Sequence, residues 1–154
     1  MKGCFDILKF ECESPEEYGF SKTYFFNSVK ERIVFAENEK EAVKLRNRNV
    51  LVRVSGYPMS LELVRGFEEK NALFLLDFSE ITKTGRGKRA SVLKRMRNFA
   101  RMCLKYKVPF AVASFAENEG EMRTAEELVH IGFLIGLNRG EGQGALSRLE
   151  KILG

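Results

Sequence analysis

The chain has 154 residues, of which 44% are hydrophobic and 31% are charged, and it contains only three prolines. A chain of this length can bury a real core as one domain, and this composition excludes the disordered and fibrous classes. We therefore expect one globular domain over residues 1–154.

Neither the cysteines nor the apolar segments point to an extracellular or membrane protein. Cys4, Cys12 and Cys103 are odd in number and lack C-x-x-C spacing, which argues against a disulfide framework and a zinc site. Acidic residues interrupt the N-terminal region, and no apolar run approaches the roughly 20 residues of a membrane helix. We expect a soluble cytoplasmic protein with reduced thiols and no membrane contact.

Positive charge is concentrated in one stretch of the sequence. The net charge is +5, from 26 basic and 21 acidic residues, but residues 81–116 contain ten Lys or Arg and no Asp or Glu. The other residues therefore hold 16 basic against 21 acidic side chains. The molecule is predicted to be electrically polarised, with one cationic segment on an acidic body.

Short β-branched or aromatic runs alternate with amphipathic stretches of helical period, which is typical of βα units and a parallel sheet. In chain order, the predicted strands are residues 4–10, 32–36, 50–54, 72–78, 110–115 and 133–137. The predicted helices are residues 39–46, 61–69, 90–106, 125–131 and 145–153. The triplet Tyr24-Phe25-Phe26 is expected to form a short helix or turn.

Two segments give more specific predictions. Residues 72–78 are nearly all apolar, which favours a central strand covered on both faces. Ser60 is a predicted N-cap of the helix 61–69, with Leu61, Val64 and Phe67 on its inner side. Because six strands are too few for the eight of a full barrel, we expect an α/β fold with a parallel sheet and a reduced or incomplete TIM-barrel-like form. An open sheet is the alternative.

The longest predicted helix and the loop before it, residues 82–89, carry a cationic face. Within the helix the basic residues recur at intervals of three and four, which places them within about a quarter turn. In the loop, Gly85 and Gly87 let the backbone lie close to a partner. The helix residues expected to face the sheet are Leu93, Met96, Ala100, Cys103 and Leu104. The basic residues predicted to bind a partner are Lys83, Arg86, Lys88, Arg89, Lys94, Arg97, Arg101 and Lys105.

The composition of this cationic face indicates an anionic partner. A run of mixed sign is usually a solvated helix face, but this run lacks every Glu–Lys pair that would support the helix. Five of the ten basic residues within residues 81–116 are Arg, whose planar guanidinium group can form two hydrogen bonds to one phosphate. We therefore predict binding of nucleic acid through phosphate contacts, with an acidic protein partner and plain solvation as alternatives.

Other motifs do not predict catalysis by this chain. Gly87-Lys88 lacks the Ser or Thr of a P-loop, and the three glycines of residues 140–144 are predicted to form a flexible turn rather than a phosphate cradle. His130, the only histidine, has no second residue with which to hold a metal, and Asp77 and Glu80 at a strand end are predicted to be structural. We expect no catalytic residue, no metal ligand and no cofactor bound by the protein itself.

From residue 72 onward the sequence resembles the ribonuclease P protein component 3 family, the p30-type subunit of archaeal and eukaryotic ribonuclease P. The resemblance covers residues 72–153, just over half of the chain. The motifs that carry it follow the family's order and are Arg89-Ala90, Lys105-Tyr106-Lys107, Ser114-Phe115-Ala116, Glu121-Met122-Arg123, Gly132 and Ala145-Leu146-Ser147.

The resemblance implies an accessory subunit of barrel-like fold that works with a small ferredoxin-like ribonuclease P protein subunit. It implies ribonuclease P RNA and precursor tRNA as partners, because the catalytic RNA of that enzyme removes 5′ leaders from precursor tRNA. The chain would be an enzyme only as a subunit of the endoribonuclease holoenzyme, and the metal ions of the reaction would belong to the RNA. Arg89 and Arg123 match motif positions, so Arg123 joins the predicted RNA-binding residues.

Two departures from the family and two rival functions complete the sequence-based expectations. The chain is shorter than the usual member, which implies a missing βα unit, and Thr124-Ala125 stands where the family often has a proline. One rival is a stand-alone barrel enzyme that holds a phosphorylated metabolite at residues 140–144 and turns over without RNA. The other is a protein-interaction module that uses apolar strand edges and the acidic surface.

Overall fold

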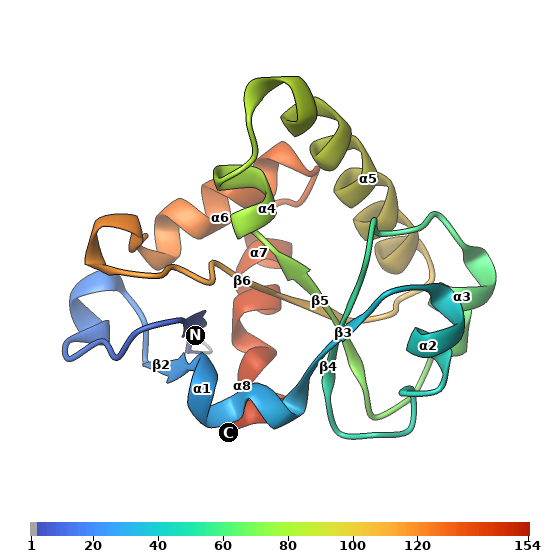
Figure 1. Cartoon of the computed structure of the whole chain (residues 1–154), viewed down its shortest axis with the longest axis horizontal. Helices are drawn as coiled ribbons and strands as arrows, with labels where there is room; N and C mark the ends of the chain where they lie inside the picture. The colour runs from blue at the N-terminus through green and yellow to red at the C-terminus, as the bar shows by residue number, and fades with distance from the viewer. Residues whose placement is uncertain (1–2) are drawn as a thin grey trace.

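A computed structural model describes residues 3–154 and shows an α/β fold built on parallel strands (Figure 1). The strands pair as two sheets, β1-β2 and β3-β4-β5-β6, and every pairing is parallel. The strand bounds are β1 Phe5–Leu8, β2 Lys22–Phe25, β3 Ile33–Ala36, β4 Leu51–Val54, β5 Leu73–Asp77 and β6 Phe110–Ala113.

Backbone hydrogen bonds join the two sheets just beyond β6. Leu8 and Ala116 form a parallel bridge, the Lys9 amide donates to the Ala116 carbonyl at 2.8 Å, and the Phe115 amide donates to the Ile7 carbonyl at 3.0 Å. The spatial order is therefore β2-β1-β6-β5-β4-β3, and no described strand pairs with the outer edge of β2 or β3. The reduced, barrel-like α/β fold expected from the sequence is confirmed.

The sheet is covered on both faces. Along β5, Leu73 and Leu75 belong to an inner core, whereas Phe74 and Leu76 belong to an outer core beneath the helices. This explains why residues 72–78 are nearly all apolar, and the prediction of a strand covered on both faces is confirmed. The inner core consists of Phe5, Ile7, Tyr24, Ile33, Leu51, Leu73, Leu75, Ala111, Ala113, Phe115, Leu149, Ile152 and Leu153.

Side-chain caps begin several of the helices. Ser60 accepts a hydrogen bond from the Leu63 amide at 3.2 Å, as predicted, and Thr124 with Glu127 and Asn138 with Glu141 form capping boxes. The helix bounds are α1 Phe26–Val29, α2 Glu39–Val43, α3 Leu61–Gly66, α4 Ser79–Thr82, α5 Arg86–Lys105, α6 Ala125–Leu134, α7 Arg139–Ser147 and α8 Leu149–Leu153. Short 3-10 turns lie at Pro15–Tyr18, Lys30–Arg32 and Glu119–Glu121. None of the helices within residues 3–154 is long and apolar enough to span a bilayer.

The predicted strand over residues 133–137 is wrong. The helix α6 continues to Leu134, and Gly136 then adopts a left-handed φ of 86° while the Leu137 amide donates back to the Gly132 carbonyl. Phe133 and Leu134 are apolar but 41% and 49% exposed, so their hydrophobicity reflects a helix surface and not a buried strand.

The predicted flexible turn over residues 140–144 is also wrong. These glycines lie inside α7, whose Asn138–Glu141 capping box begins the helix. At Gly142 a Cβ atom would meet the Val129 backbone at 3.6 Å, so α7 packs closely on α6 there. The helix expected at residues 145–153 therefore begins earlier and is divided into α7 and α8.

Two further expectations need correction. Of the triplet expected to form a short helix or turn, Tyr24 and Phe25 belong to the strand β2, which pairs with β1, and only Phe26 begins the short helix α1. Only Tyr24 of β2 is buried, so its apolar pattern is too short to predict a strand. In α3, Leu61 is 44% exposed, and the buried face is made by Leu63 and Val64.

Asp6 is fully buried where the two sheets meet. Its Oδ1 accepts hydrogen bonds from the Ser114 amide at 2.8 Å and from the Ile7 amide at 2.9 Å, and its Oδ2 accepts the Ser114 hydroxyl at 2.6 Å. Burial raises the pKa of Asp6 to about 7, although the hydrogen bonds from Ser114 act in the opposite direction. This carboxyl therefore ties β1 to the end of β6.

We predict that alanine substitutions at Gly140 and at Gly136 have opposite effects on the free energy of unfolding. Gly140→Ala should raise the free energy of unfolding by about 0.5–1 kcal/mol, because Gly140 lies in a helix and a Cβ there meets only the Asn138 side chain at 3.6 Å. Gly136→Ala should lower it by about 1 kcal/mol or more, because φ at Gly136 is 86°. Urea unfolding of both variants measures the difference, and a destabilised Gly140→Ala protein contradicts the helical assignment.

We predict that Asp6 makes stability depend on pH. The pKa of Asp6 in the folded protein is about 7, above the roughly 3.9 of an unfolded aspartate, so the folded state holds an extra proton between these values. The contribution of Asp6 to the free energy of unfolding should therefore be largest when the pH is below the pKa of unfolded aspartate, and it should be lost as the pH rises through about 7. Asp6→Asn should remove this loss in urea titrations between about pH 5.5 and 8, and the same pH dependence in both proteins would refute the assignment.

Candidate nucleic-acid interface

The helix α5 packs one face on the outer side of the sheet (Figure 1). Its Phe99 ring stands edge-on to Phe74 of β5 with centroids 4.9 Å apart, and burial raises the pKa of the Cys103 thiol to about 12. The buried residues of α5 are Val92, Met96, Phe99, Ala100 and Cys103. Leu93 is half-buried and Leu104 is 37% exposed, so the expectation that Leu104 faces the sheet is wrong.

Seven of the eight exposed basic residues of α5 form what we call the α5 cationic surface, and the eighth, Arg95, donates to the Ser91 hydroxyl at 2.6 Å. All of its members are exposed, and none forms an ion pair with a carboxylate in the part of the chain that the structure describes. An exposed cation without an acidic neighbour keeps its charge available to a ligand. The surface consists of Arg86, Lys88, Arg89, Lys94, Arg97, Arg101 and Lys105.

The N-terminal end of α5 is electrostatically unusual. Arg86, Lys88 and Arg89 occupy its first turn, which holds no acidic residue, and Gly85 stands at the N-cap without a side-chain hydrogen bond. The amide groups at a helix N-terminus carry partial positive charge, so cations there are unfavourable and anions are favourable. A Cβ at Gly85 or Gly87 would meet nothing within 4 Å, so the backbone of this turn is open. An anion bound at this end would reduce the repulsion among the three cations and their unfavourable interaction with the partial positive charge of the helix amides.

Two arginines of the α5 cationic surface are tethered without being neutralised. Arg97 donates through Nη2 to the Leu134 carbonyl at 2.9 Å, and Arg89 donates through Nη2 to the Thr84 carbonyl at 3.0 Å. Carbonyl groups fix the orientation of a guanidinium while leaving its full charge and several donors for another acceptor. Both arginines are therefore held in place for contact with an anion.

Lys83 lies apart from this surface. Its Nζ is 2.9 Å from Oε1 of Glu121, in the 3-10 turn that precedes α6, and 3.2 Å from Oε1 of Glu117, just before that turn. Although burial alone would lower the pKa of Lys83, the hydrogen bonds to Glu121 and Glu117 raise it. Lys83 thus links α4 to the segment after β6 and has acidic partners, unlike the other predicted RNA-binding lysines.

Arg123 also lies apart, immediately before α6. It lines a cavity with Lys83 at the carboxyl ends of β5 and β6, and its nearest carboxylate oxygen, Glu127 Oε2, is 3.9 Å away. The nine residues predicted from the sequence therefore fall into seven on α5 and two at this cavity. Sequence spacing found the helix face but gave no signal that Lys83 and Arg123 share a cavity.

The mouth of the incomplete barrel contains a second charged cluster that the sequence did not predict. Arg53 of β4 approaches Glu80 of α4, with Nη2 donating to Oε1 at 3.3 Å, and its Nη1 lies 3.7 Å from Asp77 Oδ2. The Nε atom is 3.3 Å from Glu80 Oε2 but forms no hydrogen bond. Tyr57 donates its hydroxyl to Glu80 Oε2 at 2.5 Å and accepts the Asp77 amide at 2.9 Å.

Apart from Arg53 Nε, the polar groups of this cluster interact mainly with one another. Burial raises the pKa of Asp77, opposed by hydrogen bonds from Ser79 and by the charge of Arg53, and burial together with Glu80 raises the pKa of Tyr57 well above its ordinary value. Asp77 and Glu80 face Arg53 and Tyr57, in agreement with the structural role expected for them. Within residues 3–154, no group of three or more His, Cys, Asp or Glu side chains could hold a metal ion.

Comparison with known proteins places this geometry in context. No family model matches the chain. A curated relative is 28% identical over 132 residues, a match that covers 82% of this chain and 63% of the relative. That relative is ribonuclease P protein component 3 of Archaeoglobus fulgidus. The resemblance seen in the sequence motifs is confirmed and extends beyond residues 72–153, although the chain spans less than two thirds of the relative's length.

A solved structure shares the fold. A chain in the cryo-EM structure of archaeal ribonuclease P with mature tRNA superposes with a TM-score of 0.66 at 15% sequence identity. The superposition covers 97% of this chain and 78% of that chain, so nearly every element described above has a counterpart. At this level of identity the likeness shows the fold alone.

We predict that the Arg53 cluster stabilises the barrel mouth. Arg53→Met should lower the free energy of unfolding by about 1–3 kcal/mol, because Glu80 and the largely buried Asp77 lose their countercharge. Arg65→Met is the matched control, since Arg65 pairs with Glu68 on the exposed surface and should cost less than about 1 kcal/mol. Equal effects in chemical denaturation would show that the cluster contributes no more than a surface pair.

Proposed function

We propose that this protein is an RNA-binding subunit of a ribonuclease P and that it holds RNA through the α5 cationic surface. The observation that carries the proposal is that all eight basic residues of α5 are exposed and have no acidic partner among the described residues. Like charges at helical spacing destabilise a helix by a few tenths of a kcal/mol per pair, and phosphate groups would remove that cost. Phosphate contacts give affinity without base-specific contacts.

The comparisons support ribonuclease P as the assembly. The curated relative is named as a protein component of that enzyme, and the structural neighbour is a chain of an archaeal ribonuclease P bound to mature tRNA. Both likenesses cover most of this chain. We accordingly propose ribonuclease P RNA and precursor tRNA as its nucleic-acid partners and the processing of tRNA 5′ ends as its role.

In this proposal the protein supplies binding and the RNA supplies the chemistry. The charged groups at the barrel mouth satisfy one another, and His130 is an exposed residue whose Nε2 lies 3.7 Å from Glu126 Oε1. We propose that the chain acts in the endoribonuclease only as a subunit and that metal ions used in cleavage are held by the RNA. A ferredoxin-like protein partner and a cytoplasmic location stay predictions.

Residues 140–144 do not support the rival function of a stand-alone enzyme acting on a phosphorylated metabolite. Its phosphate was expected at a flexible turn over residues 140–144, and these residues are helical. The rival protein-interaction function keeps some support. Phe35, 46% exposed, lies on the outermost strand β3, whereas the exposed apolar residues Leu104, Phe133 and Leu134 lie beside the α5 cationic surface.

The test is reversal of charge on α5. Arg101→Glu with Lys105→Glu removes two cations that form no hydrogen bond or ion pair with another described element. The fold should therefore be unchanged, while the affinity for RNA should fall at every salt concentration. The slope of log K against log salt should become shallower by about 2, one for each lost phosphate contact.

The matched control reverses two exposed lysines elsewhere, Lys44→Glu with Lys70→Glu, and so changes net charge equally. This control should bind RNA far more tightly than the α5 variant. If both double variants weaken RNA binding to the same extent, total charge rather than α5 governs binding, and the proposed interface is wrong.

A further inference from the structure

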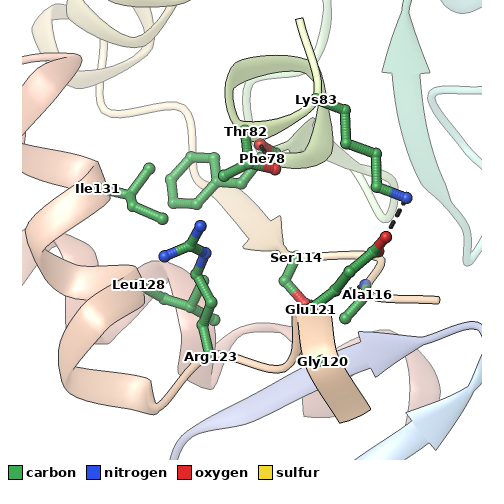
Figure 2. A pocket seen from close by; sticks show the side chains of 10 residues that line it. All are labelled: Phe78, Thr82, Lys83, Ser114, Ala116, Gly120, Glu121, Arg123, Leu128 and Ile131. Carbon is green, nitrogen blue, oxygen red and sulfur yellow. Dashed lines mark hydrogen bonds and ion pairs between the residues drawn. The ribbon is translucent and has the colours of Figure 1, made fainter. Parts of the chain in front are cut away.

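A cavity of about 210 Å³ lies between the carboxyl ends of β5 and β6, with α4 on one side and α6 on the other (Figure 2). Pockets for drug-sized ligands are usually about 300–1,000 Å³, so this one has room for a single small group. Its walls include Phe78, Leu128 and Ile131, and its polar groups come from Lys83, Glu121 and Arg123.

The walls of the cavity are held by the fold. Phe78 and Leu128 are almost completely buried, and Ser114, which also lines the cavity, is fixed by its hydrogen bonds to Asp6. The ion pair between Lys83 and Glu121 closes one side at 2.9 Å. The cavity is thus formed before any ligand arrives, which lowers the entropic cost of binding.

Two planar charged groups face the cavity with unused hydrogen-bonding capacity. Arg123 makes no hydrogen bond to any other described residue. Glu121 uses Oε1 to accept the Glu117 amide at 3.0 Å and to pair with Lys83, while Oε2 accepts no hydrogen bond from residues 3–154. The bond from the Glu117 amide, followed by Lys83, lowers the pKa of Glu121, so it is an ionised acceptor. Figure 2 shows the Arg123 and Glu121 side chains on opposite sides of the space.

The charge balance argues against a phosphate in this cavity. Lys83 is already paired with Glu121 and Glu117, Glu117 also lies near Lys9, and Arg123 lies 3.9 Å from Glu127, so each cation here has a carboxylate neighbour. A phosphate would meet these carboxylates at close range. Apolar walls with an arginine at one side and a carboxylate at the other instead fit a neutral planar group that has acceptors on one edge and donors on the other.

We propose that the cavity binds a single unpaired nucleobase extruded from the RNA, with guanine as the preferred base. The Arg123 guanidinium would donate to guanine O6 and N7, and Glu121 would accept from guanine N1–H and the N2 amino group. Proteins read RNA sequence mainly at such unstacked bases, by hydrogen bonds to their edges and apolar contact with their faces. This inference rests on the proposed RNA-binding function and adds a base-reading site separate from the phosphate-binding α5 cationic surface.

The experiment is an NMR titration of the full chain with guanosine, adenosine, cytidine, uridine and inorganic phosphate. We expect guanosine to shift the backbone amides of Ala116, Gly120 and Leu128, with affinity at least roughly fivefold above that for adenosine, which lacks O6 as an acceptor and the N1 proton. Comparable affinity for all four nucleosides, shifts of these amides by phosphate alone, or no shift with any nucleoside overturns the proposal. The last result would leave the cavity for a side chain of a protein partner.

Variants separate base recognition from folding. Arg123→Lys keeps the charge but loses the planar pair of donors, so guanosine binding should weaken at least roughly fivefold with an unchanged melting temperature. Arg65→Lys, on the exposed surface, is the control and should bind as the wild type does. Retained guanosine binding in Arg123→Lys contradicts the assigned contact. Guanosine carries no phosphate, so this result stands apart from the α5 charge-reversal test, and either proposal can fail alone.

Discussion

The junction at Asp6 and Ser114 is the contact on which the arrangement of the molecule depends. One fully buried carboxyl accepts three hydrogen bonds there, two of them from Ser114, and so joins a two-stranded and a four-stranded sheet into one curved surface. The same junction places the segment after β6 against α4, where Lys83 meets Glu117 and Glu121. Together with the backbone hydrogen bonds between β1 and the segment after β6, this contact joins the sheets around the inner core, and its Ser114 also lines the cavity.

The basic residues of this protein fall into two groups, one paired with carboxylates and one without such partners among the described residues. At the barrel mouth, Arg53 and Lys83 each face carboxylates and stabilise the connections between elements. On α5 the basic residues face outward without such partners in the described chain, although charge repulsion and the helix dipole both oppose this arrangement. A cationic helix on an otherwise acidic body is the electrostatic arrangement expected of a surface that binds polyanions.

Local signals predicted part of this structure. The apolar run at residues 72–78 and the three-and-four spacing of basic residues on α5 are properties of a single element, and both predictions agree with the structure. The three glycines of residues 140–144 favour a turn by composition, but the Asn138–Glu141 capping box begins a helix that contains them. The Arg53 cluster and the Arg123 cavity join residues from several elements, so no spacing in the sequence could reveal them.

We propose that this chain binds ribonuclease P RNA through phosphate contacts on α5. The most direct measurement is the affinity of the purified protein for a ribonuclease P RNA and for an unrelated RNA of equal length, at several salt concentrations. We expect tighter binding to the ribonuclease P RNA and an affinity that falls steeply as salt is raised. Equal affinity for the two RNAs, or an affinity that does not change with salt, would contradict it.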